Sequence, residues 1–95
     1  MPSTEATLRL TVAALMHLTG ERQADLAAGL GLSQTQISRK QAGTASWSLA
    51  DVDRLSAHYG IAVGDLLVGV DRAVHCLPAR RRAPAPGAAQ LTIHP

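Results

Sequence analysis

The sequence has few aromatic side chains, a single cysteine and no long apolar run. Trp47 and Tyr59 are the only aromatic residues, so a core must be built from Leu, Val, Ile and Ala, a mixture that favours helices. The single Cys76 excludes an internal disulfide and fits a reducing cytosol. No apolar stretch approaches the roughly 18 residues of a membrane span, and the N-terminus lacks the pattern of a secretory signal. We therefore expect a cytoplasmic protein that does not enter a membrane.

The 95 residues leave room for one small domain, not for a deep enzymatic core with a substrate domain. Residues 1–70 hold five basic and six acidic groups, a net charge of −1, whereas residues 71–95 hold four arginines and one aspartate, a net charge of +3. The positive charge is thus concentrated near the C-terminus. Because charge alone indicates nucleic-acid binding only weakly, a functional prediction has to rest on a motif.

Start and stop signals divide the first 70 residues into five short helices, which predicts an all-α fold. Ser3 or Thr4 can cap a first helix that Gly20 ends. The second helix covers about residues 23–29 and has no clean cap, because Glu21 or Arg22 stands at that place. The buried stripe of the first helix, at helical spacing, comprises Leu8, Val12, Leu15 and then Leu18 or Thr19.

Two capping boxes mark the next helices. Ser33 with Gln36 opens a third helix that Gly43 ends, and Ser48 with Asp51 opens a fourth that Gly60 ends. A last short helix begins at Val63 or Gly64, and Leu66 and Leu67 close the core. The inward stripe of the fourth helix is predicted to comprise Leu49, Val52, Leu55, Ser56 and Tyr59.

The composition changes from about Asp71, where Pro, Ala and Arg become frequent. This change predicts an extended, flexible basic segment and divides the chain into residues 1–69 and residues 70–95. Gln90–Ile93 alternate with period two, which is enough for a short strand.

Residues 23–42 have the pattern of a helix-turn-helix, two short helices joined by a tight turn that contains glycine. Ala27 is small where the two helices must cross, and Gly31 supplies the backbone angles of the turn. Ile37 is the one strong apolar residue of the second of these helices and anchors it on the first. The remaining residues of that helix are polar, so the helix contributes little to a core and is expected to contact something polar.

These residues carry a resemblance. The segment QADLAAGLGLSQTQISR, residues 23–39, resembles the lambda-repressor and Cro-like family, also called the XRE-type family. Residues 47–55 and 60–67 resemble its fourth and fifth helices, so the likeness covers about residues 5–69. The loop and fourth helix look most like repressors of actinobacteria and their phages. The departure is Lys40, where the family more often has an apolar residue.

The resemblance implies a role for individual residues. The third helix enters the DNA major groove with its first residues against base edges. Gln pairs with adenine and Arg with guanine, so the outer face of that helix is expected to read bases through Gln34, Thr35, Ser38 and Arg39. The expected phosphate contacts, which position the protein without specifying sequence, are Gln23, Lys40, Thr44 and Ser46.

The function that the resemblance implies is that of a transcription regulator on double-stranded DNA in the cytoplasm of a bacterial host, at the nucleoid. A repressor is expected, of the phage immunity or Cro type. One such helix covers few base pairs, so a homodimer on two half-sites about 34 Å apart is expected, with residues 66–95 as the dimerisation region. The alternative is a protein-binding module such as an antitoxin. No enzyme activity, cofactor, metal or small-molecule substrate is expected.

Several residues outside the predicted base and phosphate contacts also need an interpretation. Trp47 is expected in the core, and the lone histidines His17 and His58 at the surface or rim. His75 and Cys76 have no second pair at metal-ligand spacing. The run Arg80, Arg81 and Arg82 is either a solvated charge run or an arm on DNA, where basic arms bind phosphates or enter the minor groove.

Overall fold

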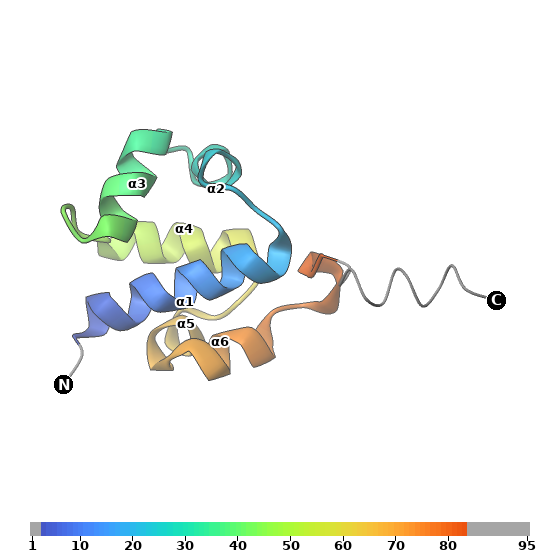
Figure 1. Ribbon diagram of the computed structural model, residues 1–95. Helices are drawn as coiled ribbons and strands as arrows, with labels where there is room; N and C mark the ends of the chain where they lie inside the picture. The colour runs from blue at the N-terminus through green and yellow to red at the C-terminus, as the bar shows by residue number, and fades with distance from the viewer. Residues whose placement is uncertain (1–2, 84–95) are drawn as a thin grey trace.

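The computed structural model describes residues 3–83, in which six α-helices and one 3₁₀ turn succeed one another without a strand. Figure 1 shows α2 and α3 at one end of the molecule, α1 and α4 across its middle, and α5 and α6 at the opposite end. The helices are α1 (Thr4–Thr19), α2 (Gln23–Leu30), α3 (Gln34–Ala42), α4 (Leu49–Tyr59), α5 (Val63–Val68) and α6 (Val70–Cys76), followed by the 3₁₀ turn η1 (Ala79–Arg81).

The predicted caps set where the helices begin. Ser3 Oγ accepts a hydrogen bond from the amide of Ala6 at 3.0 Å. In the capping box of α3, Ser33 Oγ accepts from the Gln36 amide at 3.1 Å while Gln36 Oε1 accepts from the Ser33 amide at 2.8 Å. Ser48 and Asp51 form the same reciprocal pair at α4. These bonds satisfy amides that a helix leaves without partners at its start, and the predicted starts of these helices are confirmed.

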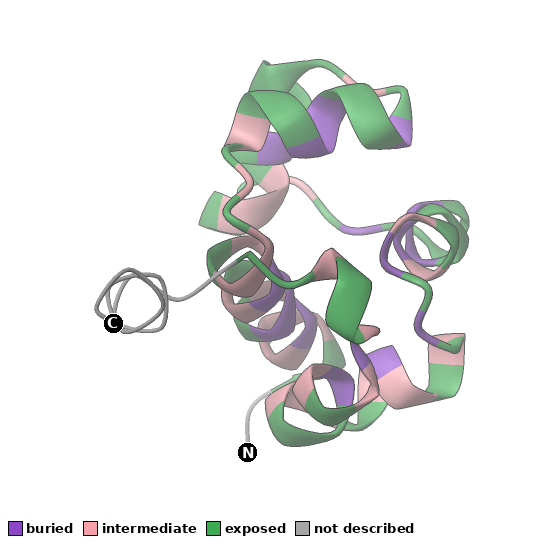
Figure 2. Cartoon of the chain, turned by 90° about the vertical axis from the view of Figure 1, so that its right-hand side faces the viewer, coloured by how far each residue is buried: buried purple, intermediate pink, exposed green. Residues whose placement is uncertain are grey.

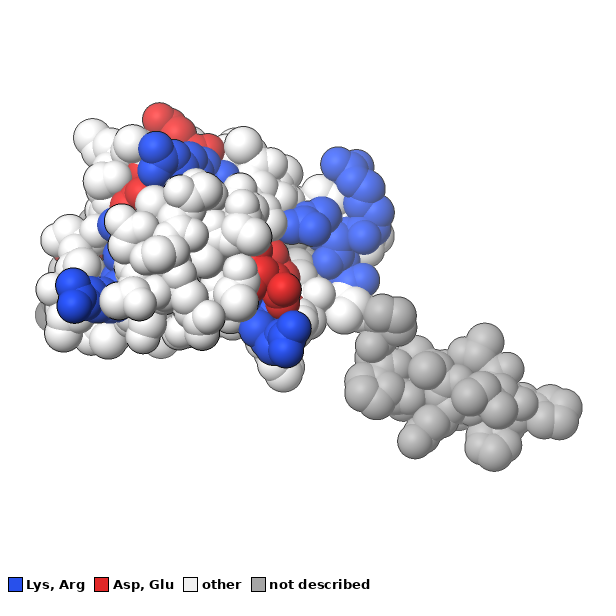
Figure 3. All heavy atoms as spheres, turned by 90° about the horizontal axis from the view of Figure 1, so that it is seen from above, with Lys and Arg blue, Asp and Glu red and all other residues white. Residues whose placement is uncertain are grey.

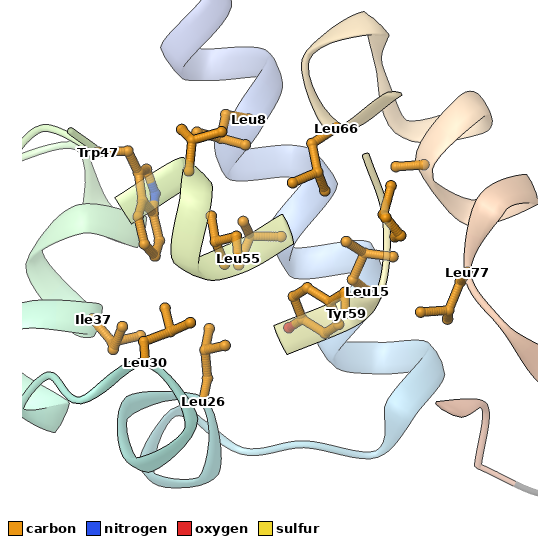
Figure 4. Packing of buried hydrophobic residues seen from close by; sticks show 14 of the residues in the cluster. Leu8, Leu15, Leu26, Leu30, Ile37, Trp47, Leu55, Tyr59, Leu66 and Leu77 are labelled. Atoms are coloured by element: carbon orange, nitrogen blue, oxygen red, sulfur yellow. The ribbon is translucent and has the colours of Figure 1, made fainter. Parts of the chain in front are cut away.

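The core lies where α1, α4 and the two helices of the helix-turn-helix meet. Figure 4 shows aliphatic side chains of α1, α2, α4 and α5 around Tyr59 and Trp47, and Figure 2 shows the buried positions on the inward sides of the helices. Trp47 is buried, as expected from the sequence. The largest fully buried side chains are Tyr59, Leu15, Leu26, Ile37, Leu55, Ile61, Leu66, Val12 and Thr11.

One prediction for α4 is wrong. Leu49 was expected on the inward stripe, but it is 83% exposed. The inward position of the first turn is taken instead by Asp51, which is 3% exposed. An aspartate is buried there because it both closes the capping box and pairs with a lysine of α3, as described below.

The segment after Gly69 also differs from the expectation of an extended arm. Residues 70–76 form α6, which packs along α1. Ala73 and Leu77 are buried, and Val70 and Val74 are partly buried. These four residues follow helical spacing, so the apolar stripe, not the Pro and Arg content, decides the local structure. The predicted strand at residues 90–93 lies outside the described residues.

No helix within the described residues is both long enough and apolar enough to cross a membrane.

Candidate nucleic-acid interface

The helices α2 and α3 form the predicted helix-turn-helix. Gly31 ends α2 with φ of 69°, a left-handed conformation that costs glycine little. Ala27 and Leu26 of α2 are buried, and so is Ile37, the only buried residue of α3. Most of the other residues of α3 are exposed on the outside of the molecule, whereas Lys40 and Gln41 near its end are partly buried.

The outer face of α3 is hollowed. A depression of about 400 Å³ is lined by Gln34, Thr35, Ser38 and Arg39 of α3 together with Gln23, the first residue of α2. The four residues of α3 are exposed. The structure thus brings together, on one surface, all four residues predicted to read bases and one predicted to hold a phosphate.

The loop after α3 contains two more of the predicted phosphate contacts, Thr44 and Ser46, in exposed positions. The backbone amide and Oγ1 of Thr44 both donate to the carbonyl of Arg39, at 3.0 and 3.2 Å, so the loop folds back onto the end of α3. The Ser46 side chain is exposed, and its carbonyl accepts from Lys40 Nζ at 2.9 Å. The loop is therefore held in one place. The Thr44 hydroxyl is bonded to the Arg39 carbonyl, whereas Ser46 has an exposed side chain.

Lys40 lies differently from the expectation. Its Nζ is 2.6 Å from Asp51 Oδ2 and 5.6 Å from the centre of the Trp47 ring, and the side chain is only 14% exposed. Burial raises the pKa of Asp51, but the hydrogen bonds from Lys40 and Ser48 outweigh it and hold that pKa below its usual value. The ammonium group of Lys40 thus forms an ion pair that links α3 to α4. Because that pair engages its charge inside the protein, Lys40 does not lie where a phosphate contact was expected.

A chain of hydrogen bonds that the sequence did not indicate fixes the same loop to α1. Trp47 Nε1 donates to Gln41 Oε1 and Gln41 Nε2 donates to the carbonyl of Arg9, each at 3.1 Å. The Trp47 amide donates to Glu5 Oε1 at 3.0 Å. These partners are separated by up to 42 residues, and no local pattern announces such a pairing.

The sequence analysis also missed the position of Arg9. Its guanidinium lies against Gly43, where a β-carbon would be 3.4 Å from Arg9 Cζ. This places a positive charge of α1 beside the loop that carries Thr44. A lone arginine on the first helix gives no sequence signal of this placement.

The three arginines of the C-terminal run have different surroundings. Arg80 is exposed, whereas Arg81 Cζ lies 5.8 Å from the centre of the Tyr59 ring. Arg82 is exposed too, but its Nη2 donates to the carbonyl of Val74 at 2.5 Å. Figure 3 shows mostly uncharged residues over the face seen from above and a group of basic side chains at its right-hand edge.

Two further features of the described residues bear on metal binding and on cysteine reactivity. Within residues 3–83 no group of three His, Cys, Asp or Glu side chains could hold a metal ion. Desolvation, followed by the charge of Asp65, raises the pKa of the Cys76 thiol, which keeps it in the less reactive protonated form.

A polar helix displayed on a glycine turn, above a core that places it outward, is the architecture of a helix-turn-helix DNA-binding domain. Comparison with protein families agrees, since the model of the Cro/C1-type HTH DNA-binding domain matches residues 9–71, more than half of the chain. The chain belongs to this family. A search of curated proteins and a search of solved structures each return no match.

Proposed function

We propose that this protein is a sequence-specific regulator of transcription that binds double-stranded DNA, with α3 in the major groove. The observation that carries this proposal is the polar depression of about 400 Å³, in which Gln23 joins the outward residues of α3. A major groove presents a different pattern of donors and acceptors for each base pair. Exposed amide, hydroxyl and guanidinium groups on one helix face are the chemistry that reads such patterns.

The proposed roles follow from side-chain chemistry. Gln34, in the first turn of α3, can bind adenine N6 and N7, and Arg39 can bind guanine O6 and N7. Thr35 and Ser38 lie beside them and supply hydroxyl groups that both donate and accept.

Phosphate contacts flank this face. Gln23 stands at the start of α2, where free amides favour an anion, and Thr44 and Ser46 stand in the loop after α3. Arg9 adds a cation next to that loop. These groups fix the register of the protein on the duplex.

The further proposal is a repressor that acts as a homodimer in the cytoplasm. A protein that occupies an operator over a promoter blocks polymerase by occupancy alone, which requires no surface beyond the described interface. Half-sites would lie about 34 Å apart on one side of the duplex. Residues 66–95 are the proposed dimerisation region, of which residues 84–95 lie outside the described part of the chain.

Selection from a library of random 30-base-pair duplexes tests the function. We expect a preferred duplex, and we expect Arg39→Ala to weaken binding to it by about 1–3 kcal/mol with relaxed preference at one base pair. Arg54→Ala is the matched control, because Arg54 is an exposed arginine on α4 that lies outside both the proposed DNA contacts and the proposed dimerisation region.

Two results contradict the proposal. Absence of any preferred duplex overturns sequence-specific binding. A uniform loss for Arg39→Ala across all duplex variants assigns Arg39 to a phosphate.

A further inference from the structure

A partly buried polar cluster joins three segments that are distant in sequence. Glu21 lies between α1 and α2, His58 lies near the end of α4, and Arg81 lies in η1. Glu21 Oε2 is 2.5 Å from His58 Nε2, and Arg81 Nη2 is 3.3 Å from the same nitrogen. The side chains of His58 and Glu21 are only 15% and 11% exposed. His58 is thus partly buried, which fits the expected rim position, but it is bonded to Glu21 and is not a lone histidine.

The geometry determines where one proton lies. An oxygen of a carboxylate can only accept, so at 2.5 Å from Glu21 the Nε2 atom of His58 must be the donor. Arg81 can then only lie beside the ring, because a protonated nitrogen offers it no acceptor. Glu21 is held from its other side by Thr19 Oγ1, which donates to Oε1 at 2.9 Å. The carboxylate is thus fixed by partners on α1 and α4.

His58 also touches α2 directly. A β-carbon on Gly29 would lie 2.5 Å from His58 Cε1 and 2.6 Å from Nδ1, so the imidazole rests on the bare backbone of α2. Glycine in a helix interior costs about 1 kcal/mol relative to alanine, and this close approach is the reason for it. The sequence analysis did not single out Gly29, although a glycine inside a short helix is a signal that could have indicated a close contact.

The C-terminal segment covers the cluster from outside. Arg81 lies over the ring of Tyr59, and the amide of Ala83 donates to the carbonyl of Leu18 at 2.8 Å. Burial, followed by the charge of Glu21, raises the pKa of Tyr59. Tyr59 Oη and Arg81 Nε are buried without hydrogen-bond partners in the described part of the chain.

The start of α2 depends on support from outside the helix. Arg22 stands at the N-cap, but an arginine side chain has no acceptor for the free amides of the first turn. Only the reverse bond is present, in which the Arg22 amide donates to Asp25 Oδ2 at 2.9 Å. A helix of eight residues is marginal by itself. Glu21, which Thr19 and His58 hold in place, stands two residues before Gln23 and so lies next to the start of α2.

We propose that His58 and Arg81 are positioning residues for DNA binding, forming a latch by which the C-terminal segment holds the start of α2 and hence Gln23. This inference rests on the proposed function, in which Gln23 contacts a phosphate. Arg81 itself contacts no DNA. It closes the cluster over His58, and His58 fixes Glu21 and the backbone of α2.

The first part of the test uses no DNA. Backbone amide resonances of Arg81→Ala and Arg80→Ala are compared with those of the wild type in the full chain. The two variants lose the same charge from neighbouring residues, but only Arg81 contacts the cluster. We expect shifts at residues 21–29 for Arg81→Ala and none there for Arg80→Ala. Equal spectra in that region overturn the latch whether or not the protein reads DNA.

The second part measures affinity for the duplex recovered by selection, at a temperature where circular dichroism shows every variant folded. Mutations without ligand contact change affinity by about three- to thirtyfold when they act through a connecting element. We expect a loss of this size for Arg81→Ala relative to Arg80→Ala, with the slope of log affinity against log salt unchanged between wild type and Arg81→Ala. His58→Gln, whose amide can still donate to Glu21, should retain more affinity than His58→Ala.

Two outcomes overturn the proposal. If both arginine variants lose affinity equally and each lowers the salt slope by about 0.9, the arginines bind phosphates as a DNA arm. If Arg81→Ala lowers the melting temperature but not the affinity of the folded protein, the cluster serves stability alone. A wild type that prefers no duplex defeats the proposed function instead, and the amide resonances still decide the latch.

Discussion

The two ends of the helix-turn-helix are fastened to the same helix, α4, by different means. At the end of α3, Lys40 pairs with Asp51 in the first turn of α4. At the start of α2, Glu21 pairs with His58 in the last turn of α4. The helix α4 carries none of the proposed base contacts, yet it sets how far apart the two ends of the DNA-binding face are held.

The two fastenings differ in what surrounds them. The ammonium of Lys40 also bonds the Ser46 carbonyl, so this pair is satisfied largely by its own loop. Arg81 covers the pair of Glu21 and His58 on its outer side, with Nη2 at 3.3 Å from His58 Nε2. The comparison teaches that the end of α3 is held by its own loop together with α1 and α4, whereas the start of α2 also depends on Arg81, far along the chain.

The largest expected effect concerns the ion pair of Lys40 and Asp51 at the end of α3. Lys40→Met removes the closer of two basic partners of the buried Asp51, the other being the half-exposed Arg54 at 3.4 Å, and breaking a buried pair costs up to about 3 kcal/mol. We expect the free energy of unfolding, measured by urea titration, to fall by about that amount. Arg39→Met removes the same charge from the exposed neighbouring residue and should change it by no more than about 0.5 kcal/mol. Equal losses for the two variants would show that the pair has no special weight.

The second effect concerns the contact between His58 and α2. Gly29→Ala places a β-carbon 2.5 Å from His58 Cε1, so the ring must leave Glu21. We expect the protein to lose about 1 kcal/mol of stability, although alanine normally stabilises a helix interior by a similar amount. Gly64→Ala in α5, where a β-carbon meets no atom within 4 Å, is the control and should stabilise.

The sign should reverse when the histidine is absent. In a His58→Ala background the same Gly29→Ala change should become stabilising, by thermal unfolding of all four proteins of the cycle. A destabilising effect that persists there would point to a contact other than the imidazole.

The smallest expected effect is a dependence on pH. The pKa of Asp51 is below its unfolded value of about 3.9. Its contribution to stability is therefore complete above that value and is lost as the pH falls through the folded pKa. Melting temperatures measured from pH 5 to pH 2 should fall for the wild type and fall less for Asp51→Asn. Asp53→Asn, at an exposed position, should follow the wild type, and identical curves for all three would contradict this account.

The sequence predicted the features that depend on neighbours in the chain. Ser33 with Gln36 and Ser48 with Asp51 cap helices within four residues, and Gly31 ends one through its own backbone, so each could be placed by inspection. The polar face of α3 was predicted for the same reason, because a nine-residue helix with one buried residue has its outward residues fixed by spacing.

The features that were missed depend on partners far apart in the chain. Lys40 was assigned to a phosphate on the strength of the family resemblance, and only the fold brings Asp51 to it. Leu49 was placed inside because a stripe at helical spacing includes it, but the capping geometry turns the first turn of α4 so that Asp51 faces inward. The helix α6 was overlooked although Val70, Ala73, Val74 and Leu77 have helical spacing.

Trp47 is the single tryptophan of the chain, and its indole lies between Lys40 and Gln41 at the loop that follows α3. When Trp47 is excited selectively over Tyr59, its fluorescence is consequently an intrinsic reporter of that loop and needs no label. Titrating DNA into the unmodified protein while recording tryptophan emission would register movement at the edge of the interface directly.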